Sequence, residues 1–449
     1  MARARRAGGA VSRTPTDIDL DSYWMPFTGN RQFKAAPRLI RAAEGVHFIT
    51  EDGRRVLDGL SGLWCCGAGH NRAEIAQAIA EQARELDYAP AFQFGHRKAF
   101  ELASRIRALM PDGLDRVFFV NSGSESVETA LKIARGYWRQ RGKPSKTRLI
   151  GRAKGYHGVN FGGTSVGGIG GNRRLFGTLP DTDHLSHTLL PENRFCRGQP
   201  EHGAHLADEL EELVALHDAS TIAAVIVEPV AGSAGVIPPP KGYLERLRAI
   251  CDAYDILLIF DEVITGFGRC GAPTGAHRFG VTPDIATFAK QLTNGVVPLG
   301  AVVVRRAIYD AFMEQGGPEY QVEFPHGYTY SGHPLACAAG LAALDLFERE
   351  RFDRQAAEKA AFFEDCIHEL ANHPHVTDVR NFGLAGALSL EHYPGEPARR
   401  PFEIAMACWE RGLYVRYGGD TLQFGPAFVM EREDIARMFQ IVGDALQAG

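Results

Sequence analysis

The chain has 449 residues, of which 45% are hydrophobic, 23% charged and 10% aromatic, which is the composition of an ordinary soluble globular protein. Its net charge of −5 gives no basic field that would draw it to nucleic acid or to an anionic membrane. The longest apolar runs, such as 256–260 and 301–304, are far shorter than the ~18 residues of a membrane-spanning helix.

The spacing of the cysteines and histidines indicates neither a disulfide scaffold nor a metal site. The N-terminal segment does not indicate export. Eight Cys are too few for a disulfide scaffold, and neither a CxxC pair nor an HExxH motif occurs. We therefore expect free thiols, no metal site and a cytoplasmic protein. Residues 1–16 hold four Arg and no acid. They fit a transit peptide or a disordered tail, and we expect a tail because no amphipathic pattern or apolar core follows.

The first predicted elements are a hairpin and two helices. The strands are 46–50 and 55–57 around a turn at 51–53, and helical periodicity follows at 72–86 and 98–109. Strands and helices then alternate. We expect strands at 116–120, 148–151, 221–228, 256–260, 283–289 and 300–304, and helices at 127–138 and 242–254. This alternation predicts a doubly wound α/β domain with a mostly parallel sheet.

The last part of the chain is mainly helical, with predicted helices at 334–349 and 355–371. We expect the two ends of the chain to form a second, smaller α+β domain. The predicted organisation is a tail at 1–16, the N-terminal part of the small domain at 17–70, the large domain at 71–330 and the C-terminal part of the small domain at 331–449.

A small-residue turn follows the first strand of the large domain. The sequence Asn121-Ser122-Gly123-Ser124-Glu125 leads from that strand into a helix. Small residues let the backbone approach an anion, and the free N–H groups of a helix N-terminus bind phosphate. An ordinary N-cap explains the serines equally well. The turn is neither a P-loop nor a GxGxxG motif, so it does not point to a nucleotide.

A carboxylate and a lysine each end a buried strand of the predicted sheet. Asp261 and Glu262 follow the apolar run 256–260, and Lys290 ends the next apolar run. Open α/β sheets bind their ligands at the carboxyl ends of their strands. A desolvated lysine has a lowered pKa, which makes its amine a nucleophile toward carbonyl groups. A structural ion pair is the alternative for the carboxylate.

Because the chain contains few lysines, few residues are candidates for the buried, nucleophilic lysine. The 49 basic residues comprise 40 Arg and nine Lys, at 34, 98, 132, 143, 146, 154, 241, 290 and 359. Most of the nine lie in polar loops, turns or solvated helix faces of the predicted structure. Only Lys154 and Lys290 have small or apolar neighbours, and only Lys290 ends a predicted buried strand. A phosphate-binding turn, a buried acid and a buried lysine are together what pyridoxal phosphate requires.

The segment from Leu258 through Asp261-Glu262-Val263 to Ala289-Lys290 resembles the signature of class III pyridoxal-phosphate aminotransferases, which have fold type I. Further blocks that resemble this family are 121–125, 156–158, 228–229 and 326–334, and the similarity covers roughly residues 20–445. Within the family, segments 24–28, 63–64 and 416–420 look most like ω-amino acid (β-alanine):pyruvate aminotransferases.

The resemblance implies roles for individual residues around pyridoxal 5′-phosphate. Lys290 would bind the cofactor covalently and shuttle the proton, and Asp261 would keep the pyridine nitrogen protonated. The remaining implied cofactor contacts are Ser122, Gly123 and Ser124 at the phosphate, Tyr156 and Val263 on the two ring faces, His157 and Glu228 nearby, and Thr329 at the phosphate of the partner subunit. Each of these residues has a structural alternative, such as a core, turn or interface role.

The resemblance also implies the substrate contacts and the assembly. Arg416 would bind the substrate carboxylate and would be paired with Glu228, although a surface salt bridge is its alternative. Trp64, Tyr156, Phe27 and Phe92 would line the pocket. We expect a homodimer with shared active sites, which could pair into a tetramer.

Three positions depart from the family pattern. Ile264 replaces the Gln of ornithine-type enzymes, Cys270 replaces the usual Thr, and Gln291 follows the lysine where a small residue is common. The expected reaction is ping-pong transfer of an amino group from an ω-amino acid or primary amine to pyruvate. The alternatives are another amino donor, 2-oxoglutarate as acceptor, an aminomutase, a decarboxylating aminotransferase or a non-catalytic binding protein.

Overall fold

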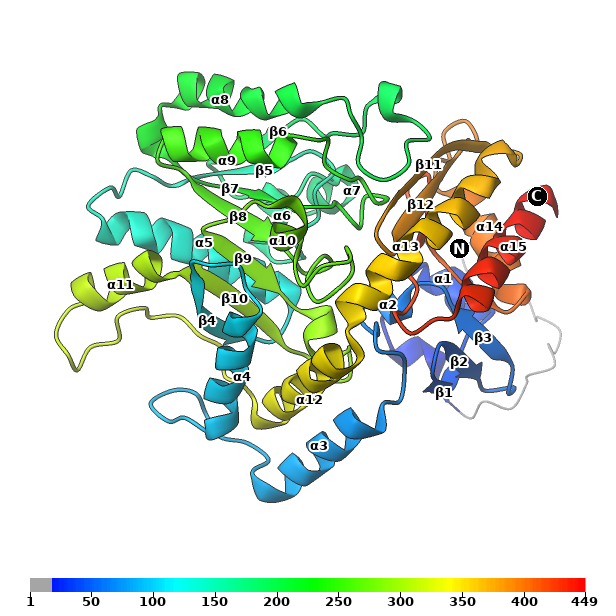
Figure 1. Ribbon diagram of the computed structural model, residues 1–449, viewed down its shortest axis with the longest axis horizontal. Coiled ribbons are helices and arrows are strands. Elements are labelled where there is room, and N and C mark those ends of the chain that lie inside the picture. Colours follow the sequence, from blue (N-terminus) through cyan, green and yellow to red (C-terminus); the bar gives the residue numbers. More distant parts are fainter. Residues whose placement is uncertain (1–17, 449) are drawn as a thin grey trace, which may run out of the picture.

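The computed structural model describes residues 18–448, so the predicted tail at 1–16 lies outside the described residues. A seven-stranded sheet in the order β4-β10-β9-β8-β7-β5-β6 forms its centre (Figure 1). Only β10 runs antiparallel to its neighbours, so the other six strands end at the same edge. The strands are β4 (Leu114–Val120), β5 (Arg148–Arg152), β6 (Thr182–Leu185), β7 (Ile222–Val227), β8 (Leu257–Asp261), β9 (Ile285–Phe288) and β10 (Gly300–Arg305).

Helices cover both faces of this sheet, because successive side chains of a strand point to opposite faces. Ala224 and Ile226 of β7 pack in one apolar cluster with α5 and α11, whereas Val225 and Val227 pack in another with α8 and α9. The helices around the sheet are α5 (Gly123–Gln140), α6 (Phe161–Val166), α7 (Gly170–Arg174), α8 (Glu209–His217), α9 (Tyr243–Ala253), α10 (Gly275–Phe279) and α11 (Arg306–Gln315).

The two ends of the chain meet in a smaller sheet. Strand β3 pairs in parallel with β13, and Leu57 lies opposite Leu413. The sheet has the order β1-β2-β3-β13. A second four-stranded sheet, β11-β12-β15-β14, is antiparallel, and Figure 1 shows both at the right of the molecule. The strands are β1 (Ile40–Glu44), β2 (His47–Thr50), β3 (Arg55–Asp58), β11 (Val376–Phe382), β12 (Ala385–Leu390), β13 (Leu413–Tyr414), β14 (Arg416–Gly418) and β15 (Thr421–Phe424).

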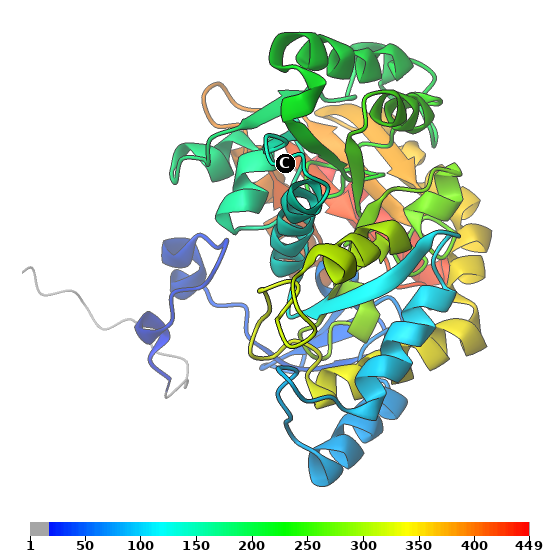
Figure 2. The ribbon, with the colours of Figure 1, turned by 90° about the vertical axis from the view of Figure 1, so that its left-hand side faces the viewer.

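The remaining helices belong to the two ends of the chain. Figure 2 shows α3 and α4 together at the lower edge of the molecule, where both pack against α12. These helices are α1 (Asn30–Ala35), α2 (Ser61–Trp64), α3 (Ala73–Glu85), α4 (Arg97–Ala108), α12 (Pro334–Glu350), α13 (Phe352–His368), α14 (Arg399–Glu410) and α15 (Arg432–Ala448). The domain boundaries at 70/71 and 330/331 stay a prediction.

Most elements predicted from hydrophobic periodicity are confirmed, with shifted ends. The predicted helix 127–138 begins earlier, at Gly123, directly after the small-residue turn. Strand β6 was not predicted, because it has four residues, lies at the edge of the sheet and buries only Leu185. The antiparallel direction of β10 was not predicted either, since an apolar run carries no information about direction.

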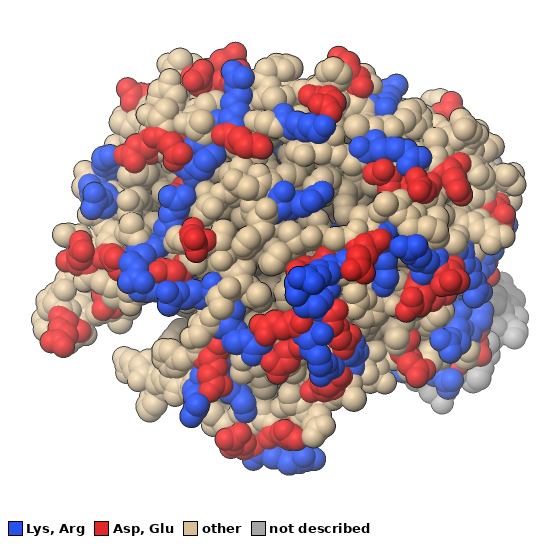
Figure 3. Space-filling view, in the orientation of Figure 1, with Lys and Arg blue, Asp and Glu red and all other residues tan. Residues whose placement is uncertain are grey.

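The surface carries charges of both signs. Figure 3 shows Lys and Arg interspersed with Asp and Glu over the visible face, in agreement with the small net charge. Between residues 18 and 448, no helix is both long enough and apolar enough to cross a membrane.

Candidate active site

The turns that follow five strands of the large sheet surround a cavity of about 320 Å³. Strands β4, β5, β7, β8 and β9 are parallel, so their carboxyl ends bring residues far apart in the sequence to one place. The structure brings nine of the ten predicted cofactor residues to this cavity. They are Ser122, Gly123, Ser124, Tyr156, His157, Glu228, Asp261, Val263 and Lys290.

Lys290 follows β9 and is the first residue of a short 3₁₀ turn that ends at Thr293. Its backbone is left-handed, with φ of 49°, which is unfavourable for a residue with a Cβ atom. Burial lowers the pKa of its amine, while the nearby Cys65, Asp261 and Glu228 act in the opposite direction. The cavity therefore favours a neutral, nucleophilic amine.

Asp261 ends β8 and is held by three donors. Its Oδ2 atom lies 2.8 Å from His157 Nδ1. Its Oδ1 atom accepts hydrogen bonds from the Val263 N–H at 3.1 Å and the Thr287 hydroxyl at 3.3 Å. Asp261 and His157 are 5% and 1% exposed, and His157 Nε2 has no partner among the described residues. The Asp261 carboxylate is thus held in place in the cavity wall by the Val263 N–H, the Thr287 hydroxyl and the His157 ring.

Glu228 follows β7 and is also buried. Its two oxygens accept hydrogen bonds from the Tyr156 N–H and the Gly232 N–H, each at 2.9 Å. Burial raises the pKa of this carboxyl group. No hydrogen bond or ion pair joins Glu228 to Arg416 in residues 18–448, so the expected pairing is not observed; the carboxylate is instead held by the two backbone N–H groups.

The N-terminus of α5 opens into the cavity. The Ser122 hydroxyl caps the helix by accepting from the Glu125 N–H at 3.2 Å, so the N-cap considered as an alternative is present. Ser124 Oγ accepts from the Val159 N–H at 3.2 Å. The N–H groups of Gly123 and Ser124 find no acceptor among the described residues. Free N–H groups at the start of an 18-residue helix suit an anion such as phosphate.

Close packing shapes this turn. A Cβ atom on Gly123 would come within 3.0 Å of Val263 Cγ1, and one on Gly158 would come within 2.5 Å of Ser124 Oγ. Gly158 has φ of 90°, so a side chain there would be strained as well. Val263 therefore lies against the α5 turn, at the side of the cavity.

A second, larger cavity of about 1070 Å³ adjoins the first, and Tyr156, Ser233 and Lys290 line both. Trp64, Phe27 and Arg416 line the larger cavity. Arg416 is half-buried and lies close enough to Lys290 and Tyr156 for its charge to act on both; it adds to the lowering of the Lys290 pKa by burial and opposes the raising of the Tyr156 pKa by burial. Its guanidinium group forms no hydrogen bond or ion pair with any residue in 18–448. The alternative role of Arg416, a surface salt bridge, is therefore not observed, and Arg416 is free to bind an anion.

Two predicted residues lie away from both cavities. Thr329 is exposed, and its carbonyl accepts a hydrogen bond from the Tyr88 hydroxyl at 3.0 Å. Phe92 is 55% exposed and lies against Gly327, where a Cβ atom would meet its ring at 2.9 Å. Within one copy of the described chain, these residues do not take part in the site.

Sequence reasoning missed Cys65, Ser233 and Thr293, which line the smaller cavity. Cys65 directly follows Trp64, so the predicted pocket segment 63–64 could have been extended to it. The lysine argument also missed a buried group. Lys146 was assigned to a polar loop but is 4% exposed. Its amine donates to the carbonyls of Ala219, Ile222 and Asp255 at 2.9, 3.1 and 2.6 Å.

Comparison with known proteins agrees with this geometry. The family model described as aminotransferase class-III matches residues 28–446. The chain is 57% identical to the beta-alanine–pyruvate aminotransferase of Pseudomonas aeruginosa, with 96% of both chains covered. It is 56% identical to the omega-amino acid–pyruvate aminotransferase of Pseudomonas putida, also with 96% of both covered. It is 58% identical to an omega-aminotransferase of Caulobacter vibrioides, with 94% and 97% covered.

Solved structures have the same fold. An (S)-enantioselective omega-transaminase from Thermomicrobium roseum superposes with a TM-score of 0.90 at 36% identity, covering 96% of this chain and 97% of the other. A PLP-bound amine transaminase from an uncultivated Pseudomonas species gives a TM-score of 0.87 at 38% identity, covering 95% and 98%. The chain belongs to the class III aminotransferases, enzymes of fold type I that depend on pyridoxal 5′-phosphate.

Proposed function

We propose that this enzyme transfers the amino group of an ω-amino acid or another primary amine to pyruvate, with L-alanine as product. One observation carries the substrate assignment: Arg416 has no partner in residues 18–448 and lines a cavity that it shares with Lys290. Three relatives at 56–58% identity support the proposal; they are named beta-alanine–pyruvate aminotransferase, omega-amino acid–pyruvate aminotransferase and omega-aminotransferase.

The residues of the smaller cavity fit pyridoxal 5′-phosphate. The free N–H groups of Gly123 and Ser124 would bind the phosphate, and the Asp261 carboxylate would accept a hydrogen bond from the protonated ring nitrogen. Tyr156 and Val263 would enclose the ring. When bound, the cofactor supplies a carbonyl group that condenses with amines and a ring that accepts an electron pair.

Lys290 and Asp261 would have different catalytic roles: Lys290 would transfer a proton, and Asp261 would stabilise a charge. Lys290 Nζ, whose pKa is lowered by burial, would take the proton from the substrate carbon that bears the amine and would deliver it to the cofactor carbon that was the carbonyl carbon. Asp261 would hold a positive charge on the ring nitrogen through a charge-assisted hydrogen bond. His157, at 2.8 Å from Asp261, would keep that carboxylate oriented.

Arg416 would select substrates by their carboxylate. A guanidinium group binds a carboxylate through two parallel hydrogen bonds. Pyruvate and an ω-amino acid place the carboxylate at different distances from the reacting carbon, and the volume of about 1070 Å³ leaves room for Arg416 to adjust. Trp64, Tyr156 and Phe27 would enclose the rest of the substrate.

A panel of donors with two acceptors tests this function. β-Alanine, 4-aminobutanoate, putrescine and 1-phenylethylamine are each supplied with pyruvate or 2-oxoglutarate, and the amino acid formed is measured. Alanine from at least one ω-amino acid, with little glutamate, supports the proposal. Preference for 2-oxoglutarate, release of CO₂ or isomerisation without an acceptor would instead identify another class III reaction.

We further propose a homodimer in which each subunit completes the other's site. Large apolar side chains remain exposed around the loops that hold Phe92 and Thr329, among them Phe94 at 71%, Tyr320 at 91% and Val322 at 61%. Exposed apolar groups of this size mark contact surfaces. Sedimentation at micromolar concentration is expected to give the mass of a dimer or of paired dimers, and a monomer that retains full activity would exclude shared sites.

A further inference from the structure

Gln291 is the residue next to Lys290 that departs from the family pattern, and its side chain lines neither cavity. It is 7% exposed. Its Oε1 atom accepts a hydrogen bond from the Gly67 N–H at 2.7 Å. The side chain therefore joins the lysine turn, residues 290–294, to a segment more than 220 positions earlier, which we name the wall loop, residues 64–69.

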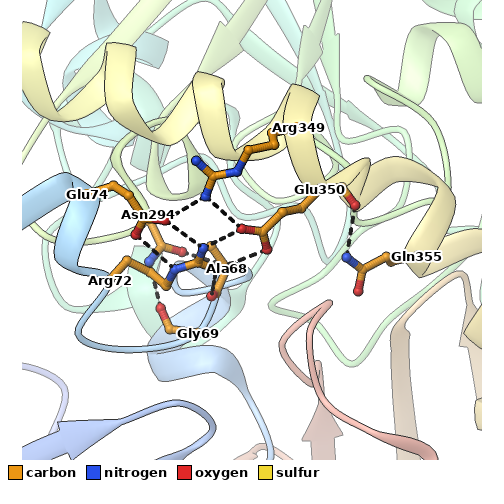
Figure 4. A network of polar contacts seen from close by, with 8 residues as sticks. All are labelled: Ala68, Gly69, Arg72, Glu74, Asn294, Arg349, Glu350 and Gln355. Carbon is orange, nitrogen blue, oxygen red and sulfur yellow. Dashed lines mark hydrogen bonds and ion pairs between the residues drawn. The ribbon is translucent and has the colours of Figure 1, made fainter.

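Asn294, at the other end of the lysine turn, binds the same loop. Its Oδ1 atom accepts from the Ala68 N–H at 2.9 Å, and its Nδ2 atom donates to the Gly69 carbonyl at 2.8 Å. Figure 4 shows Asn294 beside Ala68 and Gly69, with Arg72 extending from the same region to Glu350 at the end of α12. Arg72 also donates to the Ala68 carbonyl at 3.1 Å, so the loop is anchored on two sides.

Both connected segments have a strained backbone. Lys290, Asn294 and Trp64 are left-handed, with φ of 49°, 53° and 66°. Such conformations persist only where the surroundings hold them, and they gather at functional sites. Three hydrogen bonds from two side chains hold these segments here, and both side chains are buried, so water cannot replace them cheaply.

The backbone of each region also packs tightly against side-chain atoms of the other, at Gly67 in the wall loop and at Gly295 directly after the lysine turn. A Cβ atom on Gly67 would come within 2.5 Å of Gln291 Oε1, and one on Gly295 would come within 2.8 Å of Cys65 Cβ. A shift of the lysine turn would therefore move the wall loop or break the hydrogen bonds. The wall loop carries Trp64, which lines the larger cavity, and Cys65, which lines the smaller one.

We propose that Gln291 and Asn294 are positioning residues that clasp the lysine turn to the wall loop. The clasp fixes Lys290 Nζ relative to the wall that the substrate contacts. The proposal rests on the reactive role of Lys290 proposed above. Because Lys290 would move the proton in both half-reactions, loosening the clasp slows both and leaves substrate binding largely unchanged.

Substitution of Gln291 tests the clasp. Gln291→Met removes the acceptor at nearly constant volume, whereas Gln291→Glu keeps an acceptor for the Gly67 N–H. Gln82→Met is the matched control, because Gln82 is 3% exposed, donates to the Leu86 carbonyl, accepts from Lys98 Nζ and lines neither cavity. The readouts are kcat and KM of each half-reaction, the Tm, and the pH midpoint of the visible absorbance of the holoenzyme.

We expect Gln291→Met to lower kcat in both half-reactions by up to about 100-fold, as ångström-scale misplacement does, with little change in KM. The absorbance midpoint is expected to shift as well. Gln291→Glu should stay close to wild type at its own optimum pH, and Gln82→Met should lose thermal stability without losing kcat. If Gln291→Met does not fold, Asn294→Ser removes the Gly69 bond and should give the same kinetic pattern.

The proposal is overturned if Gln291→Met or Asn294→Ser keeps wild-type kcat. It is also overturned if the loss of kcat is matched by Gln82→Met at an equal loss of Tm. Failure of the proposed role of Lys290 would give a different result. In that case Lys290→Ala would retain turnover, whatever the effect of the Gln291 substitutions.

Discussion

The free guanidinium group of Arg416 leads to a sharp prediction about substrate choice. Replacing Arg416 by Met removes the charge and keeps most of the apolar stem. The kcat/KM of carboxylate substrates should fall, whereas the kcat/KM of a neutral amine of similar size should stay nearly unchanged. The reason is that Arg416 has no partner in residues 18–448, so its removal leaves no buried carboxylate of the protein unpaired.

The magnitude follows from the environment of the side chain. A hydrogen bond to a charged group contributes about 1.5–3 kcal/mol, which corresponds to roughly 10- to 150-fold in kcat/KM. Arg416 is half-buried, and solvent screens part of the interaction. We therefore expect a loss in the lower half of that range for pyruvate and for β-alanine.

The assay measures each half-reaction separately, with pyruvate, β-alanine and 1-phenylethylamine as substrates. Arg38→Met is the matched control. Arg38 lines the same cavity but already donates to Gln32 Oε1 at 3.1 Å, so its replacement should not discriminate between substrates. Equal losses for all three substrates in Arg416→Met would refute the carboxylate-binding role, as would no loss at all.

Three further outcomes can be checked. Lys290→Ala should abolish turnover and the covalent retention of the cofactor after borohydride reduction, measured by peptide mass spectrometry; labelling at another lysine would contradict the assignment. Arg416 lowers the pKa of Lys290, so Arg416→Met should raise it and move the pH profile of the neutral-amine half-reaction to higher pH, because the neutral lysine is the active form; a downward shift would be inconsistent. Lys146→Met should lower the free energy of unfolding by about 1–3 kcal/mol without changing kcat, since it removes the donor for three carbonyls. Burial lowers the pKa of Lys146 to about 8. The unfolded chain therefore binds more protons between about pH 8 and the ordinary value of 10.5, and the stability of wild type relative to Lys146→Met should rise with pH in that window. A constant or falling difference would contradict the burial argument.

The sequence by itself determined six of the seven strands of the central sheet and the residues at the ends of those that surround the site; it predicted neither β6 nor the direction of β10. Continuous apolar runs such as 256–260 predict strands buried on both faces, and the structure places Asp261 and Lys290 where those runs end. Parallel strands place their carboxyl ends at one edge, so linear spacing was enough to bring Ser122, Asp261 and Lys290 to one site. The small-residue turn before α5 was likewise readable from local sequence, because capping is a local interaction.

Only the tertiary structure decided which polar groups have partners. Arg416 remains free and Glu228 is occupied by backbone N–H groups, because these outcomes depend on segments brought together by folding. The sequence predicted an exposed Lys146 in a polar loop. In the structure its amine donates to the carbonyls of Ala219 and Asp255, which are distant in the sequence. From the sequence, Gln291 was expected only to alter the edge of the site, and its contact with Gly67 shows which segment it holds. Hydrophobic periodicity reports which face of an element is buried, whereas the pairing of a polar side chain depends on distant backbone that no local pattern encodes.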